Sequence, residues 1–279
     1  MKNIVFLILM SMLQVPCFSQ DLNYFNYDKQ DWTLWEDSKV TSDFLTANKE
    51  ILENFPYYDL LNSVEEHQSD FHLVDIDNDN INELIYNGWS GGEGELVIIY
   101  KRINHKYIKQ QVFFGRILDL KKSSTGIELV VLDYSCCAGY VDHVEVFRYN
   151  FVSKQFEIIN DIAKLRETEI PSQLIKPIRF EIVNTPYYLR YSPEILTDLD
   201  KAYLDFDPIE GQNIAAIYEA GDRGIAYAES TDSTGRIWWL VIMDQLPDND
   251  KYLYYEGNND YEYYRPVGWI SSKYLKIVK

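Results

Sequence analysis

The amino-acid sequence predicts a mainly β protein, α+β overall, with a short N-terminal helical segment followed by two β modules. The chain has 279 residues, including 23 Tyr, 13 Phe and 6 Trp, and aromatic rings fit the pleated, half-buried surface of a sheet. Apolar runs alternate with Gly- or Asn-containing turns at roughly ten-residue spacing, which is typical of antiparallel sheets. The hydrophobic content of 46% excludes an intrinsically disordered acidic chain.

The first element, residues 1–19, is expected to be a signal peptide. Lys2 precedes Ile4–Leu13, an uncharged apolar run of ten residues. The apolar core of a secretory signal spans about 7–15 residues, whereas a membrane-spanning helix needs about 20. No later segment of the sequence is long and apolar enough to span a bilayer, so no membrane span is expected.

Cleavage of this segment is expected before Gln20, because Cys17 and Ser19 supply small residues at the −3 and −1 positions. The alternative is lipidation of Cys17, but that reaction requires a small residue directly before the cysteine, and Pro16 stands there. The mature protein is therefore expected to be secreted or periplasmic.

Residues 20–70 are expected to form a helical lead segment. Between Thr41 and Phe55 the apolar positions fall on one helical face, and Pro56 ends the run. A second short helix is expected over Tyr58–Glu66.

Residues 71–160 are expected to form an antiparallel β-domain. Its six expected strands are Phe71–Ile76, Glu83–Tyr86, Leu96–Lys101, Tyr107–Phe114, Ile127–Asp133 and Val141–Phe151. Segment 161–178 has mixed charges and carries Pro171 and Pro177, which predicts an inter-domain linker. Strands resume in residues 179–279, the second β module.

One loop between two expected strands has the composition of a calcium site. Asp75, Asp77, Asp79 and Glu83 occupy positions 1, 3, 5 and 9 of a nine-residue stretch, and Ile81 can add its backbone carbonyl from position 7. Calcium takes about six to eight hard oxygens, and four carboxylates so close together repel one another without a cation. The alternative is a polar hairpin turn that binds no ion.

This loop resembles the calcium loop of FG-GAP and VCBS repeats, in which the loop lies between two strands. Asn78 and Asn80 replace the Gly residues common in that motif, and Asn tolerates the positive φ that such turns need. Glu83 replaces Asp. The resemblance implies a structural calcium ion; a single copy does not predict a whole propeller.

The second β module resembles a bacterial Src-homology-3 domain. The matching segments, in the family's order, are Leu189–Pro193, Ile214–Gly221, Ile237–Val241 and Gly268–Leu275. The resemblance implies a small Src-homology-3-like barrel over residues 179–279. Its expected core is Leu189, Ile217, Trp239 and Ile270, and Gly268 permits a close approach before the last strand. Two insertions, Thr197–Gln212 and Asp244–Pro266, depart from the family.

A ligand-binding role follows from the same resemblance. The candidate ligand-binding residues are Tyr191, Trp239, Tyr254, Tyr255 and Trp269. Tyr254 and Tyr255 belong to a Tyr-rich insertion, and tyrosine clusters are common in recognition surfaces. The alternative is that these tyrosines pack on the barrel.

The charge balance restricts the partners. There are 26 Lys+Arg and 44 Asp+Glu, a formal net charge of −18, which disfavours nucleic acid and anionic lipid. Residues 198–265 alone hold 15 acids against 5 bases. A positively charged partner or further calcium suits this region better than a phosphate-rich ligand; a solvated acidic surface is the alternative.

Cys136 and Cys137 are adjacent and are the only cysteines left after removal of residues 1–19. They can form a strained vicinal disulfide or remain a reduced pair on a strand. A thiol and His143, six residues from Cys137, can also be drawn as the dyad of an envelope hydrolase.

The sequence therefore favours a secreted, non-enzymatic binding protein with a structural calcium site and a module for a cell-wall fragment, a peptide or a protein partner. Two alternatives stay open. The first is an acidic inhibitor or immunity-type protein that caps a basic partner; the second is a hydrolase that uses Cys136 or Cys137 with His143.

Overall fold

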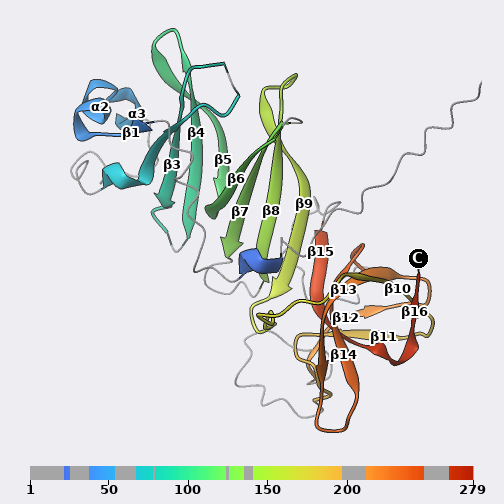
Figure 1. Cartoon of the computed structure of the whole chain (residues 1–279). Coiled ribbons are helices and arrows are strands. Elements are labelled where there is room, and N and C mark those ends of the chain that lie inside the picture. The colour runs from blue at the N-terminus through green and yellow to red at the C-terminus, as the bar shows by residue number, and fades with distance from the viewer. Residues whose placement is uncertain are drawn as a thin grey trace, which may run out of the picture.

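The computed structural model describes residues 22–25, 38–53, 67–77, 79–92, 94–123, 126–134, 141–196, 212–247 and 264–278. These residues form an elongated, mainly β molecule with two sheets (Figure 1), and the prediction of a mainly β fold is confirmed. The predicted signal peptide with its cleavage before Gln20, the expected helix 58–66, Cys136, Cys137, Tyr254 and Tyr255 lie outside the described residues.

The N-terminal sheet is an antiparallel meander whose strands follow the chain order. Its strands are β1 Ser38–Lys39, β2 Phe71–Val74, β3 Glu83–Trp89, β4 Glu95–Ile103 and β5 Lys106–Phe114. Two short helices, α2 Ser42–Ala47 and α3 Glu50–Glu53, precede β2 and pack on the sheet, and a 3-10 turn, η5 Gln68–Asp70, leads into β2. The predicted helix over 41–55 is thus divided at Asn48, and Thr41 caps its start by accepting a hydrogen bond from the Phe44 amide.

The second sheet joins the middle of the chain to its C-terminal part. Its strands in the middle are β6 Arg116–Ser123, β7 Gly126–Tyr134, β8 Val141–Asn150 and β9 Gln155–Leu165. Its C-terminal strands are β10 Ile178–Ile182, β11 Tyr187–Arg190, β12 Ile214–Tyr218, β13 Arg223–Thr231, β14 Ile237–Met243, β15 Tyr264–Ser271 and β16 Leu275–Ile277. A 3-10 turn, η8 Ser272–Tyr274, separates β15 from β16.

The junction between the two parts is a parallel pairing of β9 with β15, in which Asp161 lies opposite Tyr264. Strand β9 continues to Leu165, so the first five residues of the segment expected as a linker belong to a strand. The stretch without regular structure runs from 166 to 177.

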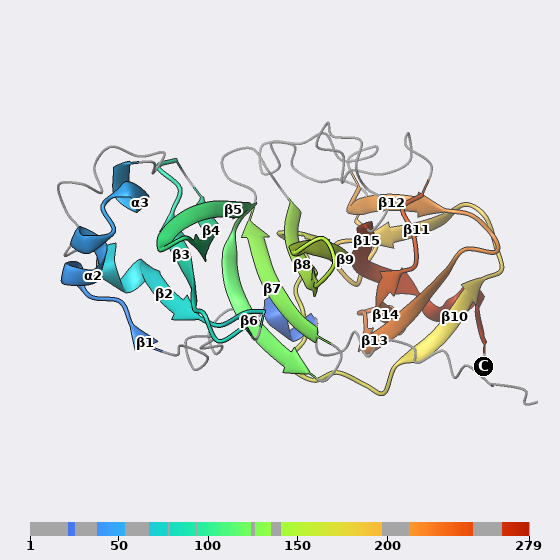
Figure 2. The same cartoon turned by 90° about the horizontal axis from the view of Figure 1, so that it is seen from above.

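The layers of the molecule lie in a row, as seen in Figure 2. The outer face of the N-terminal sheet packs on the helices through Leu45 and Ile51. Its other face packs on β6–β9, where Phe113 contacts Phe147 at a ring-centroid distance of 4.4 Å. The far face of β6–β9 packs on β13–β15 and on the 3-10 turn η1 Asn23–Phe25. Each sheet therefore buries apolar residues on both faces.

The C-terminal strands curve around a separate core that contains three of the four expected residues, Leu189, Trp239 and Ile270. Ile217 is only half-buried, and its neighbours on β12, Ala216 and Tyr218, take core positions instead. Strand β16 ends the main path of the sheet, and β12 ends a branch that reaches β15 through β11. These two strands do not pair with each other in the described residues, so the C-terminal strands do not form a closed barrel.

Candidate metal centre and ligand pocket

The acidic loop connects β2 to β3, and the antiparallel register sets Val74 opposite Glu83 at its base. Inside the loop the Asp75 carboxylate accepts hydrogen bonds from the amides of Asp79 and Asn80, both at 3.1 Å. Asn80 has φ of 63°, the left-handed conformation expected for an Asn at this position. These contacts fold the loop back on itself and bring Asp75 and Asp77 toward Glu83.

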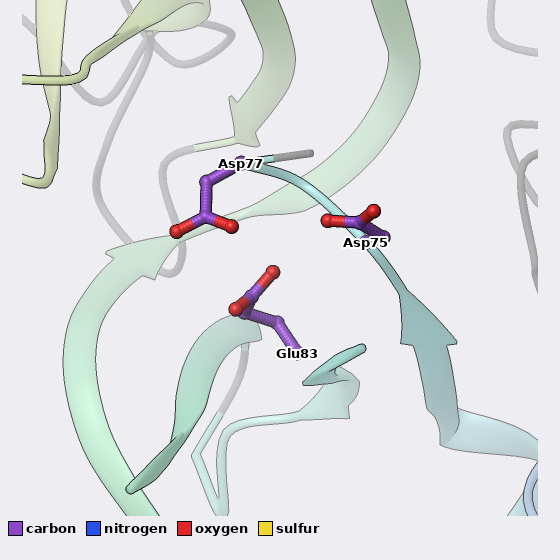
Figure 3. Close-up of side chains that lie close together, drawn as sticks. All are labelled: Asp75, Asp77 and Glu83. Carbon is purple, nitrogen blue, oxygen red and sulfur yellow. The ribbon is translucent and has the colours of Figure 1, made fainter. Parts of the chain in front are cut away.

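Three of the predicted ligands meet at one place. Asp75, Asp77 and Glu83 each offer a carboxylate oxygen, and the three oxygens lie within 4.8 Å of one another. Figure 3 shows the three carboxylates converging, two from the segment after β2 and one from the start of β3. The cluster could hold a metal ion, and its hard oxygen donors are those that calcium and magnesium prefer.

Glu83 is the buried member of the cluster, with 2% of its surface exposed. Its Oε2 accepts a hydrogen bond of 3.0 Å from the Ile76 amide, whereas its Oε1 is buried without a hydrogen-bond donor in the described residues. Burial raises the pKa of Glu83 to about 7, and the charges of Asp77 and Asp79 act in the same direction. An orphaned carboxylate oxygen of this kind fits a cation.

Among the described residues, Lys101 on β4 is the cation at this cluster. Its Nζ donates a hydrogen bond to Asp77 and lies 3.5 Å from Asp79 Oδ2 and 3.8 Å from Glu83 Oε1. Burial disfavours the charged ammonium, but its hydrogen bond and charge interaction with Asp77 outweigh this effect and raise the pKa of Lys101. Lys101 therefore offsets part of the repulsion that a divalent ion would remove.

The other two predicted ligands do not join the three carboxylates. The Asp79 side chain is exposed, and its Oδ1 accepts a hydrogen bond of 2.8 Å from the Ile81 amide. Ile81 itself is 43% exposed. Sequence spacing missed Lys101, because this residue comes from a neighbouring strand and no local pattern marks it.

Two of the predicted ligand-binding residues, Tyr191 and Trp269, line one pocket of about 540 Å³. This pocket, named here the acidic pocket, is also lined by Glu167, Glu169, Glu194 and Glu229. Trp239 does not line it: its ring lies in the core, and its Nε1 donates to Glu229 Oε2 at 3.2 Å. Sequence reasoning missed Glu167 and Glu169, which belong to the segment expected as a linker.

Two residues that line this acidic pocket carry a buried polar atom without a hydrogen-bond partner among the described residues. Trp269 is 3% exposed, and its indole N–H has no acceptor among the described residues. The Glu167 Oε2 atom is likewise buried without a donor there. Burial raises the pKa of Tyr191 to about 12, and the charges of Glu167 and Glu194 add to this shift. The pocket thus combines four glutamates with a tryptophan whose buried indole N–H lacks an acceptor.

His143, the base of the alternative hydrolase, lies on β8 with its Nδ1 at 3.2 and 3.3 Å from the two carboxylate oxygens of Asp161. Burial disfavours the charged imidazole, but the hydrogen bond and charge of Asp161 outweigh it, and the pKa of His143 is raised. Because Cys136 and Cys137 lie outside the described residues, their pairing with His143 stays a prediction.

Comparison of the chain with models of protein families, with curated proteins and with solved structures finds no match. Among the described residues, none of the helices has the length and apolarity to cross a membrane.

Proposed function

We propose that the protein is an exported, non-enzymatic binding protein whose Src-homology-3-like module takes a cationic group in the acidic pocket. The observation that carries this proposal is the lining of one pocket by four glutamates together with Trp269, whose buried indole N–H has no acceptor in the described structure. A buried donor without a partner costs about 1–3 kcal/mol, so a ligand that supplies the acceptor gains that energy.

The chemistry of the pocket indicates the class of ligand. The glutamates favour an ammonium or guanidinium group, and the Trp269 N–H requires a neighbouring acceptor such as a peptide carbonyl. A basic peptide segment supplies both groups within one residue. The amino group and amide carbonyl of a cell-wall peptide have the same chemistry.

The acidic loop adds a structural calcium ion to this proposal. Asp75, Asp77 and Glu83 would hold the ion, with Asp79 and the carbonyl of Ile81 as further ligands once Lys101 swings away. The orphaned Oε1 of Glu83 supports this assignment. The ion would relieve the repulsion between carboxylates and stabilise the β2–β3 hairpin.

A direct test is a fluorescence anisotropy titration with a labelled, end-capped hexapeptide of lysine and glycine. The wild type should bind it saturably, and a glutamate–glycine hexapeptide should not compete. Trp269→Phe removes the N–H but keeps an aromatic ring, and Glu167→Gln/Glu194→Gln removes two charges; each should weaken binding about tenfold, which corresponds to 1.4 kcal/mol.

A matched control is Glu128→Gln/Glu181→Gln, which removes two charges from strands β7 and β10, outside the pocket. If this control weakens binding as much as the pocket variants do, the attraction is a general effect of net charge, and the proposal fails.

The acidic rim also favours the second candidate, an inhibitor or immunity-type protein that caps a basic partner. Four glutamates around one cavity suit a lysine or arginine of a folded protein as well as one of a peptide. Tight, salt-dependent capture of a single basic protein, combined with weak binding of the free hexapeptide, would favour this candidate.

A further inference from the structure

A second cavity of the C-terminal strands has the opposite charge. Arg190, the residue directly before Tyr191, lines a cavity of about 370 Å³ together with Arg236 and Lys273. An adjoining cavity of about 400 Å³ shares Arg236 and Lys273 with it. The two together are named here the basic groove. None of the described residues that line them is Asp or Glu, although acids outnumber bases 44 to 26 in the chain.

The basic groove has the Asp232 carboxylate beside it, which accepts hydrogen bonds from the Arg236 amide at 3.0 Å and from the Trp238 indole N–H at 2.9 Å. In the described part of the chain, none of its three cations forms an ion pair with Asp or Glu. Arg190 is only 5% exposed, and its Nη1 donates to the neutral Asn213 Oδ1 at 2.7 Å. Burial lowers the pKa of Arg190, and the nearby charge of Arg236 adds to the effect. A buried cation without an anion is costly.

Aromatic rings hold these cations in position. The guanidinium of Arg236 lies 5.6 Å from the ring centroid of Trp238, and that of Arg190 lies 5.5 Å from the ring of Tyr188. The ammonium of Lys273 lies 5.1 Å from the ring of Tyr274. These cation–π contacts orient the charged groups, and in the described part of the chain only Arg190 among the three cations gives a side-chain N–H to an acceptor, Asn213. The walls therefore combine fixed positive charge with apolar ring faces.

We propose that the basic groove binds a short acidic peptide segment. Its carboxylates would accept charge-assisted hydrogen bonds from Arg190, Arg236 and Lys273, and adjacent apolar side chains would pack on the aromatic rings. Two adjoining cavities suit an extended chain better than a single small anion.

The net charge of the protein restricts the length of this ligand. A formal charge of −18 repels an extended polyanion such as a nucleic acid over distances of about a Debye length, roughly 8–10 Å. A segment with two or three carboxylates experiences much less of this repulsion and gains the same contacts inside the groove. The site is separate from the acidic pocket, so its test does not depend on the function proposed above.

The experiment is an anisotropy titration of the chain with a labelled, end-capped octapeptide of alternating glutamate and tyrosine. Matched peptides carry glutamine or lysine in place of glutamate. The glutamate peptide should bind at least about tenfold more tightly than either, a difference of 1.4 kcal/mol. Equal binding of the glutamate and glutamine peptides, or no saturable binding of the glutamate peptide, would overturn the proposal.

The variants locate the site. Arg236→Gln/Lys273→Gln changes two exposed cations of the groove, and Lys106→Gln/Lys109→Gln removes the same charge from β5. Only the Arg236→Gln/Lys273→Gln variant should bind the glutamate peptide more weakly, by about tenfold in Kd. Lys273→Gln alone should weaken binding of the glutamate peptide about threefold. This single variant tests the site even if the double variant fails to fold. If both double variants lose the same affinity for the glutamate peptide, the attraction is an effect of net charge and the proposal is wrong.

A competition with sodium phosphate at constant ionic strength separates a peptide site from a general anion site. Phosphate should leave peptide binding almost unchanged, because it has no apolar groups that pack on the aromatic rings of the groove and so binds there much more weakly than the peptide. Complete displacement by phosphate would mean that the groove recognises small anions, and the peptide proposal would be wrong.

Discussion

Lys101 Nζ lies 3.8 Å from Glu83 Oε1, a buried carboxylate oxygen without a hydrogen-bond donor in the described structure. The same ammonium donates a hydrogen bond to Asp77. One lysine therefore balances part of the charge of the acidic loop, and a divalent cation would compete with it for the same oxygens.

Calcium should stabilise the wild type through this loop. An ion that binds only the folded state adds about 2.7 kcal/mol to the free energy of unfolding at a free concentration 100 times its Kd. The measurement is thermal unfolding in calcium and in chelator. Asp77→Asn should abolish the calcium-dependent increase in Tm, whereas Asp43→Asn in helix α2 should retain it. An equal increase in both variants would contradict the assignment of the ion to this loop.

Removal of the lysine should have two effects of opposite sign. In chelator, Lys101→Met should lower the free energy of unfolding by about 1–3 kcal/mol, because it leaves buried carboxylates uncompensated. In calcium, the increase in Tm should exceed that of the wild type, since the ion no longer displaces an ammonium. Lys106→Met, an exposed site on β5, should show neither effect. A smaller calcium response in Lys101→Met would mean that Lys101 assists the ion.

The sequence predicted the hairpin strands well, because each has a local pattern of apolar residues and a turn. It missed β9, whose last five residues were expected in the linker, and it missed β6, which follows β5 after the single residue Gly115. There is no turn motif between them; Gly115 has φ of 103°, and a side chain there would collide with the Leu132 carbonyl. The positive φ of this one glycine separates the two strands, so no longer loop is needed between them.

The non-local contacts could not be read from the sequence. The parallel pairing of Asp161 on β9 with Tyr264 on β15 joins residues about a hundred positions apart, and local periodicity carries no information on such a pairing. For the same reason the sequence suggested Tyr191 and Trp269 as ligand-binding residues but did not bring Glu167 to them. Lys101 was missed for the same reason, because it reaches the acidic loop from the neighbouring strand β4.

The acidic face of β7–β9 predicts an unusual pH dependence of stability. Burial and the charges of Asp161 and Asp133 raise the pKa of Glu145 to about 8 from its ordinary 4.5, and His143 opposes the shift. Between these two values the folded state binds more protons than the unfolded chain, so the free energy of unfolding falls as the pH rises. This destabilisation is absent below about pH 4.5 and complete above about pH 8.

Glu145→Gln removes the titrating group. The variant should gain stability relative to the wild type between about pH 5 and about pH 9, by about 1–3 kcal/mol at the upper end. Urea unfolding at a series of pH values measures this, with Glu157→Gln at an exposed site of β9 as the control. Parallel curves for Glu145→Gln and the wild type would show that Glu145 does not titrate in this range.

The close approach of β15 to β11 should make Gly268 intolerant of a side chain. A Cβ at this position would lie 2.7 Å from Leu189 Cγ and 2.8 Å from the Arg190 carbonyl oxygen, so one of the two strands must shift. Gly268→Ala should lower the free energy of unfolding by about 1–3 kcal/mol, the usual cost of overpacking a core. Gly94→Ala is the matched control, because a Cβ there meets no atom within 4 Å.

Since Arg190 lines the basic groove and Tyr191 the acidic pocket, Gly268→Ala should also weaken the binding of both probe peptides. Chemical unfolding and the two anisotropy titrations measure these effects, and a variant as stable as Gly94→Ala would show that β11 and β15 are less tightly packed than this geometry requires.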